Sequence, residues 1–407
     1  MFDENIILIY NELNIDRKHF CLQYAGTERE VMLKKAFSPK VKSALFALLV
    51  LVAVAYSLLF TGITDLTPAA LQKLGRIKTC MDLMIYALAF LCALLEASQS
   101  WPRALLSLLL LALRWRSPLS WQQGMLLDTA LLALLSDLGT EKSNGSAFLA
   151  AHILYLPVLF ALLHWGWTSE LLMKGRKDFW IFQMGHSYGM SHPNNFAAFF
   201  MSTWMVLWLL FLPKRGWIAF LYFWTGAFAM YAMTLCRTVA VLMVGFPILY
   251  IVQEAIRRSR HPALLQAAAA APPLMAAMTV ILGSQTSYRS GKLLDDAFWL
   301  RFNAFSVLWE DGLTLFGSIT SPKSYFDNLY LWLPMYCGLI PTLGVLAAYI
   351  CMLYRLAREK RTALLATALL FVLYGVMENT AIYAAYCFVA VMAFARQDNA
   401  EKEGLPS

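Results

Sequence analysis

The long apolar runs of this chain limit its fold more than any other sequence feature. A membrane-spanning helix needs about 20 mostly apolar residues, and only helices or closed barrels satisfy every backbone polar group in lipid. We therefore predict an all-α, polytopic membrane helix bundle. The runs that predict spans cover residues 43–61, 81–96, 148–167, 196–212, 217–234, 239–252, 263–282, 329–353, 362–376 and 381–394.

Composition supports a membrane protein. The 407 residues are 60% hydrophobic and 14% charged, whereas soluble domains are about 45–50% apolar and about 25% charged. The net charge of +8 does not indicate nucleic acid as a partner, because Lys and Arg cluster in short gaps between apolar runs, as in the positive-inside bias. The seven cysteines stand singly without CxxC spacing, so we expect no metal site, redox pair or other cofactor.

Two shorter apolar runs, 104–113 and 125–135, set the span count. If both cross, the bundle has about twelve spans and both termini are cytoplasmic; a re-entrant hairpin would keep the same orientation downstream. The basic gaps agree with this orientation. The prediction divides the chain into a basic cytoplasmic segment (1–42) that is not a cleaved signal peptide, a transmembrane domain (43–396) and a cytoplasmic tail (397–407).

Two large loops fall on the outer side, at 168–195 and 283–328. The second is polar and long, and loops well above a dozen residues are usually functional or disordered. Its many aromatic residues argue against disorder. We predict that it forms a helical extracytoplasmic cap over the bundle.

The motif GHSYGMSHPNNFAAFF at 185–200 places His192, Asn194 and Asn195 at the outer mouth of a span. These polar groups suit a substrate at the membrane interface. The alternative is a helix N-cap made by Ser191 or Asn195, with Pro193 in the first turn. His186 and His192 are six residues apart and share no helix face, which argues against a metal pair.

Arg237 stands between two apolar runs with no carboxylate nearby in sequence. An arginine there is costly unless it is paired or faces a wet cavity. It can snorkel to the outer headgroups, or its fork-shaped guanidinium can bind phosphate.

The second outer loop offers further candidates. Arg289 and Arg301 flank Asp295 and Asp296 and can form either surface ion pairs or a cavity with an acid as base. Asp327, Asn328 and Tyr330 begin the next span, where a carboxylate or amide is also common as an N-cap. Gly338 and Pro341 predict a bend in that helix. No nucleotide-binding motif is present.

The motifs together resemble the repeat-unit polymerases of bacterial O-antigen, capsule and exopolysaccharide (Wzy type), which are related to the O-antigen ligase superfamily. The resemblance covers residues 168–345 in motif and the whole chain in topology. It rests on these residues: His192-Pro193-Asn194-Asn195, Arg237-Thr238, Arg301-Phe302, Thr314-Leu315-Phe316-Gly317, Asp327-Asn328-Leu329-Tyr330 and Gly338-Leu339-Ile340-Pro341. Relatives often carry an arginine before the first glycine of the first motif; here the nearest is Arg176, and His186 could stand in.

The resemblance implies a metal-independent membrane glycosyltransferase in the bacterial cytoplasmic membrane. It would move a growing glycan from undecaprenyl diphosphate to the terminal sugar of a lipid-linked repeat unit, with a chain-length regulator and a flippase as partners. Arg237 and Arg301 would stabilise the leaving diphosphate, and His192 or Asp327 would act as base or acceptor anchor. The residues expected to bind substrate are Arg289, Asn194, Asn195, Asn328, Tyr330, Arg176 and His186.

Two alternatives remain from the sequence. An O-antigen ligase-type transferase shares the topology and the arginines. A flippase or transporter is less favoured, because no internal repeat is evident, few ionisable residues fall at mid-span positions and the charges lie at the outer face.

Overall fold

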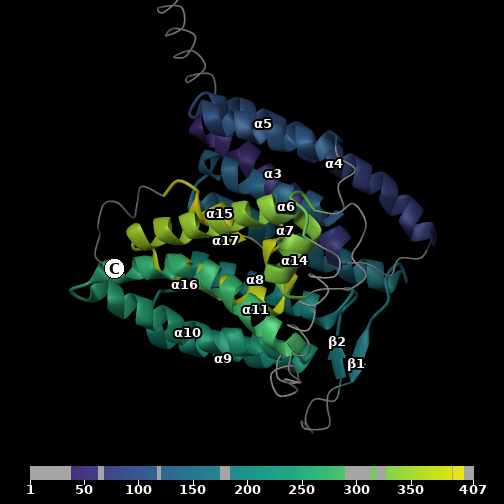
Figure 1. The fold of residues 1–407 in the computed structure, drawn as a ribbon. Coiled ribbons are helices and arrows are strands. Elements are labelled where there is room, and N and C mark those ends of the chain that lie inside the picture. The colour runs from purple at the N-terminus through teal and green to yellow at the C-terminus, as the bar shows by residue number, and fades with distance from the viewer. Residues whose placement is uncertain are drawn as a thin grey trace, which may run out of the picture.

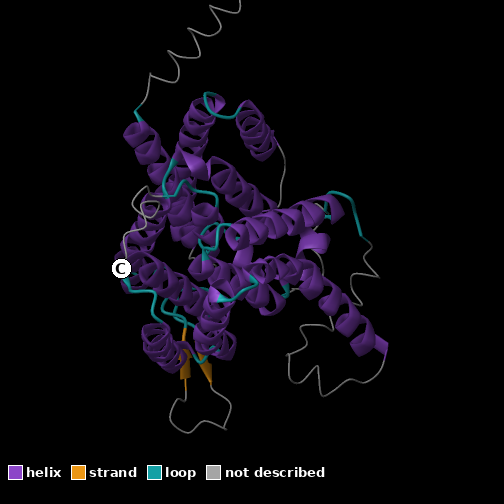
Figure 2. Ribbon diagram, turned by 90° about the vertical axis from the view of Figure 1, so that its left-hand side faces the viewer, coloured by secondary structure: helices purple, strands orange, loops and turns teal. Residues whose placement is uncertain are grey.

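Nearly all regular structure in this protein is helical (Figure 2), which confirms the all-α prediction. The computed structural model describes residues 38–62, 68–116, 121–174, 184–288, 313–317, 327–386 and 388–397. The helices are α3 (Pro39–Gly62), α4 (Pro68–Ala97), α5 (Trp101–Arg116), α6 (Trp121–Leu135), η1 (Ser136–Leu138), α7 (Glu141–His164), α8 (Pro193–Phe211), α9 (Gly216–Thr234), α10 (Arg237–Arg258), η2 (Pro262–Ala270), α11 (Ala271–Tyr288), α14 (Leu329–Trp332), η3 (Leu333–Cys337), α15 (Leu339–Arg358), α16 (Thr362–Met377), η4 (Asn379–Ile382) and α17 (Phe388–Ala393).

Eight helices in the described chain are long and apolar enough to cross a membrane, so the protein has the build of a multi-pass membrane protein. The shorter runs predicted at 104–113 and 125–135 do form helices, α5 and α6, of 16 and 15 residues. The helix that contains the run predicted at 81–96 starts earlier than this run, because α4 already begins at Pro68. The eight are Pro39–Phe60, Leu74–Ala97, Glu141–His164, Pro193–Phe211, Gly216–Thr234, Arg237–Arg258, Pro262–Gly283 and Leu339–Arg358.

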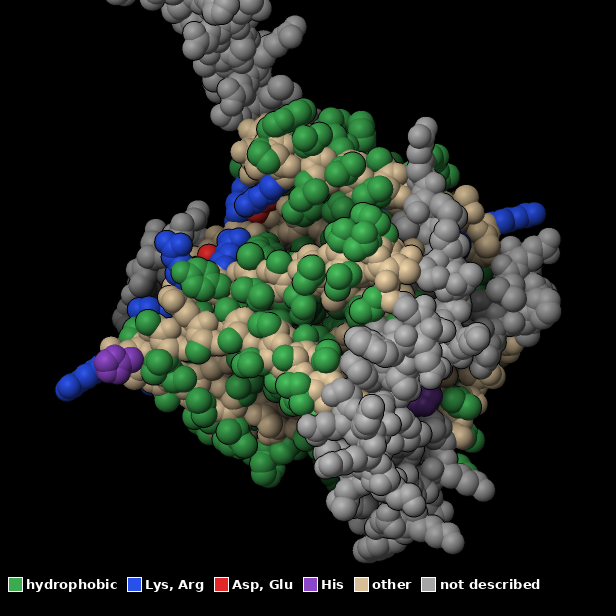
Figure 3. Space-filling model, in the orientation of Figure 1, with side chains coloured by type: hydrophobic (Ala, Val, Ile, Leu, Met, Phe, Trp, Pro, Cys, Tyr) green, Lys and Arg blue, Asp and Glu red, His purple; other side chains and the backbone are tan. Residues whose placement is uncertain are grey.

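The helices lie side by side, with α4 and α5 on one flank and α9 and α10 on the other (Figure 1). Inside the bundle, α10 packs against both α9 and α16, and α3 packs against α4 and α7. Apolar side chains cover much of the face in Figure 3, and basic side chains gather toward one end of it. This distribution is typical of a bundle whose middle lies in lipid.

The packing of α10 against α16 distinguishes the two ends of the bundle. Thr362, at the start of α16, donates a hydrogen bond to Glu254 in α10 (3.0 Å), and the two helices run in opposite directions. Arg237 begins α10 and Glu378 follows α16. At a rise of about 1.5 Å per residue, both lie about 25 Å from that hydrogen bond. Arg237 and Glu378 therefore lie at the same end of the bundle, which we call the Arg237 end. We call the opposite end, where Arg361 precedes α16, the Arg361 end.

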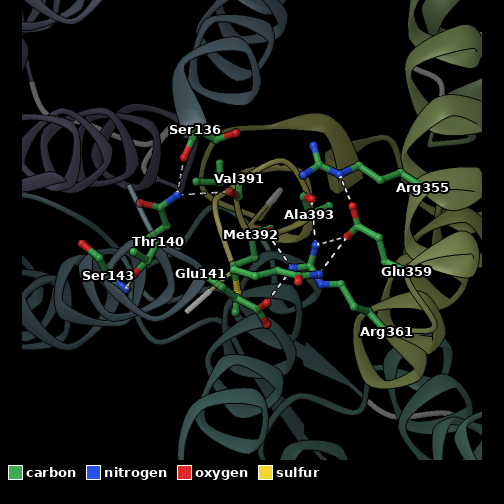
Figure 4. A network of polar contacts seen from close by, with 12 residues as sticks. Ser136, Thr140, Glu141, Ser143, Arg355, Glu359, Arg361, Val391, Met392 and Ala393 are labelled. Carbon is green, nitrogen blue, oxygen red and sulfur yellow. Dashed lines mark hydrogen bonds and ion pairs between the residues drawn. The ribbon is translucent and has the colours of Figure 1, made fainter. Parts of the chain in front are cut away.

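A network of charged side chains, Arg355, Glu359, Arg361 and Glu141, is paired within the protein at the Arg361 end (Figure 4). The Arg361 guanidinium donates to Glu141 (2.5 Å) and Glu359 (3.1 Å), and also to the carbonyl oxygens of Met392 and Ala393 (both 2.9 Å). Arg361 has only 9% of its side chain exposed. These bonds tie the loop between α15 and α16 to α7 and to the end of α17.

The single span predicted at 329–353 is wrong, because the chain breaks into α14, η3 and α15. The predicted bend at Gly338 is confirmed: this residue has φ +87°, a conformation that favours glycine. The first amides of α15 find acceptors in the segment 313–317. Leu339 donates to the Thr314 carbonyl (2.9 Å) and Ile340 donates to the Leu315 carbonyl (3.0 Å).

The continuous helix expected for the span at 381–394 is also wrong. After α16 the chain forms η4 and a turn, and only the six residues of α17 are α-helical. Irregular backbone within a membrane protein must be hydrogen-bonded inside the protein. The 378–386 segment meets this condition at Ala385, whose amide donates to Ser57 (3.1 Å) and whose carbonyl lies 2.9 Å from His152 Nε2.

The described part of the first predicted outer loop contains a short antiparallel hairpin, β1 (Leu172–Lys174) and β2 (Met184–His186). A Cβ on Gly185 would collide with the carbonyl of Thr234. Glycine is therefore needed where β2 rests against the end of α9. This packing brings the hairpin to the turn that precedes Arg237 (Figure 1).

Candidate functional site

The HPN motif begins α8 at the Arg237 end. Pro193 occupies the first helical turn as predicted, but His192 makes the N-cap, so the expectation of a cap by Ser191 or Asn195 is wrong. The backbone N–H of Asn194 donates to His192 Nδ1 (3.1 Å). The side-chain Nδ2 of Asn195 donates to the Ser191 hydroxyl (2.6 Å). Because Nδ1 accepts a hydrogen bond, a neutral His192 ring carries its proton on Nε2.

The side chain of Asn194 reaches a residue 184 positions away. Its Nδ2 donates to Glu378 Oε1 (2.9 Å), and Glu378 is only 5% exposed. Glu378 is not among the site residues predicted from the sequence. The sequence does contain a signal for this residue. Glu378 is the only charged residue between Arg361 and Arg396, in a stretch that is mostly apolar. An isolated acid in such a stretch is a functional candidate.

The 378–386 segment connects several helices around this carboxylate. The Tyr386 hydroxyl donates to the Asn195 carbonyl (3.5 Å), and the hydroxyls of Tyr374 and Thr380 lie 3.3 Å apart. The Tyr383 ring meets the Trp332 ring of α14 edge-on at 6.2 Å. The start of α8, the end of α16 and α14 therefore meet at this segment.

Below this segment lies a buried histidine. His152 of α7 stacks on Phe199 of α8 (4.7 Å, 4° between the ring planes), and its Nδ1 lies 2.7 Å from the Thr203 hydroxyl. With both ring nitrogens occupied, His152 fixes the position of the Ala385 carbonyl. We assign it a structural role, because a satisfied buried histidine has no nitrogen left for a ligand.

Arg237 is the first residue of α10 and its side chain is exposed. Leu235 enters the preceding turn with φ +56°, and the Cys236 amide donates to the Thr234 hydroxyl (3.2 Å). Within the described parts of the chain, Arg237 makes no ion pair. The guanidinium adds its charge to the positive end of the helix dipole, an arrangement that attracts anions.

His186 lies on β2, where its Nδ1 is 2.6 Å from Glu170 Oε1. The neighbouring Tyr188 packs its ring on His186 at 5.5 Å. Burial raises the pKa of Tyr188, and the Glu170 carboxylate raises it further. The hairpin therefore presents an acid–imidazole pair near the turn before Arg237.

The remaining predicted site residues divide into two groups. Arg176, Arg289 and Arg301 lie outside the described residues, so the convergence of Arg237 with Arg301 stays a prediction, as does the cap. At the other motif, Asn328 rather than Asp327 caps α14, since its Oδ1 accepts from the amides of Tyr330 (2.9 Å) and Leu331 (3.3 Å). The Tyr330 hydroxyl donates to the Val372 carbonyl (2.9 Å).

Two sequence motifs that are far apart in the chain meet in space. Gly317, of the Thr314–Gly317 motif, has φ +84° and lies directly against Gly338, which begins the Gly338–Pro341 motif. A Cβ on either glycine would collide with backbone of the other motif or of η3. Gln123 of α6 spans the junction by donating to the Tyr336 carbonyl (2.9 Å). The described part of the cap region is thus anchored where α15 begins.

A second charged cluster lies among α3, α4, α5 and α6. Arg114 donates to Asp128 (2.5 Å), Asp82 (2.9 Å) and the Tyr86 hydroxyl (3.0 Å). Arg114 is 12% exposed and Asp128 only 3%. These charges neutralise one another, which is how a membrane helix bundle can hold ionisable side chains inside it.

The fold defines a multi-pass helical membrane protein with a polar cluster at the Arg237 end. Comparisons with protein-family models, curated proteins and solved structures found no match. In the described residues, no group of three or more His, Cys, Asp or Glu side chains is placed to hold a metal ion.

Proposed function

We propose that this protein is a membrane glycosyltransferase that polymerises lipid-linked glycan repeat units. It would move the growing chain from undecaprenyl diphosphate to the terminal sugar of an incoming lipid-linked unit, on the outer face of a bacterial cytoplasmic membrane. The observation that carries this proposal is the gathering of Arg237, the His192–Asn194 motif and the Glu378 carboxylate at one end of the bundle.

The transfer needs a cation that stabilises the leaving diphosphate and a polar group that binds the acceptor hydroxyl. Negative charge grows on the departing diphosphate, and a fixed guanidinium at a helix N-terminus stabilises it. Arg237 has that placement. Arg301 and Arg289 are proposed to add to it from the loop 283–328, with Arg176 and His186 supporting from the hairpin loop. A neutral His192 ring would offer Nε2–H to an acceptor hydroxyl.

We further propose about twelve spans, with both termini cytoplasmic and the Arg237 end facing outward under the cap. The basic residues that cluster around the Arg361 end favour this orientation. A matched cysteine pair in a cysteine-free background tests it with an impermeant thiol reagent. Ser290→Cys should react in intact cells, whereas Ser259→Cys should react only after permeabilisation; the reverse would overturn the orientation.

The activity is tested by deletion and by reconstitution. A strain lacking the protein should accumulate single lipid-linked repeats on the outer face, and purified protein in liposomes should lengthen synthetic repeat units linked to undecaprenyl diphosphate. Full-length polymer that is not transferred to its final acceptor would indicate a ligase instead.

A flippase or transporter is the second candidate, and the Arg114 cluster favours it, because charges inside a helix bundle often mark a transport path. The two candidates predict different results for Asp82→Asn, which removes one of the two acids. A polymerase should keep its chain length. A flippase should lose translocation, so that lipid-linked repeats build up on the cytoplasmic side.

A further inference from the structure

Charged side chains from several elements surround Glu96, which lies near the end of α4 and is fully buried, with 0% exposed. Lys42 of α3 donates to the hydroxyl of Ser98, just beyond α4 (3.1 Å). Arg103 of α5 forms an ion pair with Asp137 of η1. The charged groups that face Glu96 are therefore Lys42, Arg103 and Asp137, each from a different element packed on α4.

This cluster lies at the Arg361 end of the bundle. Ser43, which follows Lys42 in α3, donates to Ser143 in the first turn of α7 (3.0 Å), and Arg361 reaches the same turn. The remaining neighbour of α4 is α6, whose one charged residue, Asp128, is bonded to Arg114. Arg114 lies eleven residues beyond Arg103 in α5, or about 16 Å along the helix. The two charged clusters of this flank are therefore separate.

The Glu96 carboxyl group has no hydrogen-bond donor among the described residues. Arg103 Nη1 lies 3.8 Å from Glu96 Oε1, too far for a hydrogen bond, and donates instead to Asp137 Oδ2. The Asp137 carboxyl lies within reach of a hydrogen bond to Glu96, yet its own Oδ1 is buried and also lacks a donor in this part of the structure. An ionised carboxyl buried without a donor is costly.

A proton is the ligand that best satisfies these oxygens. A protonated Glu96 becomes a donor to Asp137 and removes one of two adjacent negative charges, which is how neighbouring buried carboxyl groups commonly exist. A metal ion suits the cluster less well, because Lys42 and Arg103 already bring two positive charges. The described residues also offer no third acidic, histidine or cysteine ligand there.

We propose that Glu96 and Asp137 bind one proton between them and that this shared proton holds the end of α4 to η1. The proton comes from water at the Arg361 end. The Glu96 O–H donates to Asp137 Oδ1, while the guanidinium of Arg103 stays on Oδ2. The other side of η1 is held by Arg396, which donates to the Leu138 carbonyl (2.6 Å). Loss of the proton leaves two adjacent carboxylates that repel each other, so alkaline conditions loosen α4 from η1.

The first test detects the protonated acid by infrared spectroscopy of the full-length protein in liposomes at about pH 7. Glu96→Gln keeps the size and the neutral charge of the protonated side chain. The spectrum of wild type minus Glu96→Gln should contain the C=O stretching band of a protonated carboxylic acid, shifted in D₂O. Glu359→Gln is the matched control at the same end. It should remove only the bands of an ionised carboxylate, because Arg355 and Arg361 pair with Glu359.

The second test is thermal unfolding between about pH 6 and pH 9. An unfolded glutamate is ionised above about 4.3, so the folded state binds one proton more than the unfolded chain in this range. The stability of the wild type should therefore fall as the pH rises. Glu96→Gln binds no proton in either state. Its unfolding temperature should rise relative to that of the wild type as the pH is raised.

Two results would overturn the shared proton. One is a difference spectrum for Glu96→Gln that contains only the bands of an ionised carboxylate. The other is a difference in unfolding temperature that stays constant or shrinks as the pH rises, since Glu96 would then be ionised beside Arg103 or a bound cation. If Glu96→Gln does not fold, Glu96→Leu gives the same two measurements, because leucine also binds no proton. Neither measurement depends on the proposed function.

Discussion

The two ends of the bundle use charge in opposite ways. At the Arg361 end, one guanidinium serves two carboxylates and two backbone carbonyls and is almost fully buried (Figure 4). At the Arg237 end, the guanidinium is exposed at the start of a helix and forms no ion pair with any residue that the structure describes. The nearby buried carboxylate of Glu378 is held by an amide.

The contrast between the two guanidinium groups separates a charge that stabilises the fold from a charge that is available to a ligand. An ion pair satisfied inside the protein has little capacity left for a substrate, and removing one partner strands the other. An exposed guanidinium contributes little to stability but remains able to bind an anion. Substitutions at the two ends should therefore affect different measurements.

The largest effect is expected on activity, from Arg237→Lys. Lysine keeps the charge but lacks the bidentate fork for diphosphate, so polymerisation should fall by at least about 100-fold. The thermal unfolding temperature in detergent should not change. Normal chain length in this variant would remove Arg237 from the site.

A large effect on stability is expected from Arg361→Ala. It removes the guanidinium that pairs with both Glu141 and Glu359 and that donates to two backbone carbonyls, and breaking a buried pair typically costs about 3–5 kcal/mol. The unfolding temperature should drop clearly, whereas the rate per folded molecule should hold. Arg358→Ala, an exposed position at the same end, is the control. Equal stability of the two variants would contradict a structural role for Arg361.

A smaller loss of stability is expected from Gly338→Ala. Alanine at φ +87° is strained, and its Cβ would meet the backbone of Phe316 and Gly317, so we expect a cost of about 1–3 kcal/mol. Gly344→Ala, further along α15 with open space around it, should be neutral or stabilising by up to about 1 kcal/mol. A destabilised Gly344→Ala beside an unchanged Gly338→Ala would refute the packed glycine junction.

The smallest effect is expected on the pH dependence of stability, from Glu359 at the Arg361 end. Burial alone would raise the pKa of Glu359, but hydrogen bonds and charge from Arg355 and Arg361 hold it below its ordinary value. A lowered folded pKa gives stability that is complete above the unfolded value, about 4.3, and is lost as the pH falls through the folded pKa.

Glu359→Gln should therefore lower the unfolding temperature slightly at pH 7, by an amount that shrinks as the pH falls below the unfolded pKa of about 4.3. The measurement is thermal unfolding across this pH range, with wild-type protein as the reference. A difference that grows as the pH falls would have the wrong sign for this ion pair.

Much of the helical plan could be read from the sequence. Runs of about 20 apolar residues identify membrane-length helices, and the HPN motif marks the start of α8 because proline suits the first helical turn. The apolar runs at 329–353 and 381–394 misled the prediction, because an apolar stretch buried in protein need not be a continuous helix.

Composition and local pattern alone determine that this chain builds an all-helical, multi-pass membrane protein, since lipid leaves the backbone few other choices. Only the tertiary structure decided that Asn194 meets Glu378 across 184 residues and that Arg114 gathers two acids from neighbouring helices. Such pairings depend on which helix faces pack together, and that packing is a property of the whole bundle rather than of any one segment.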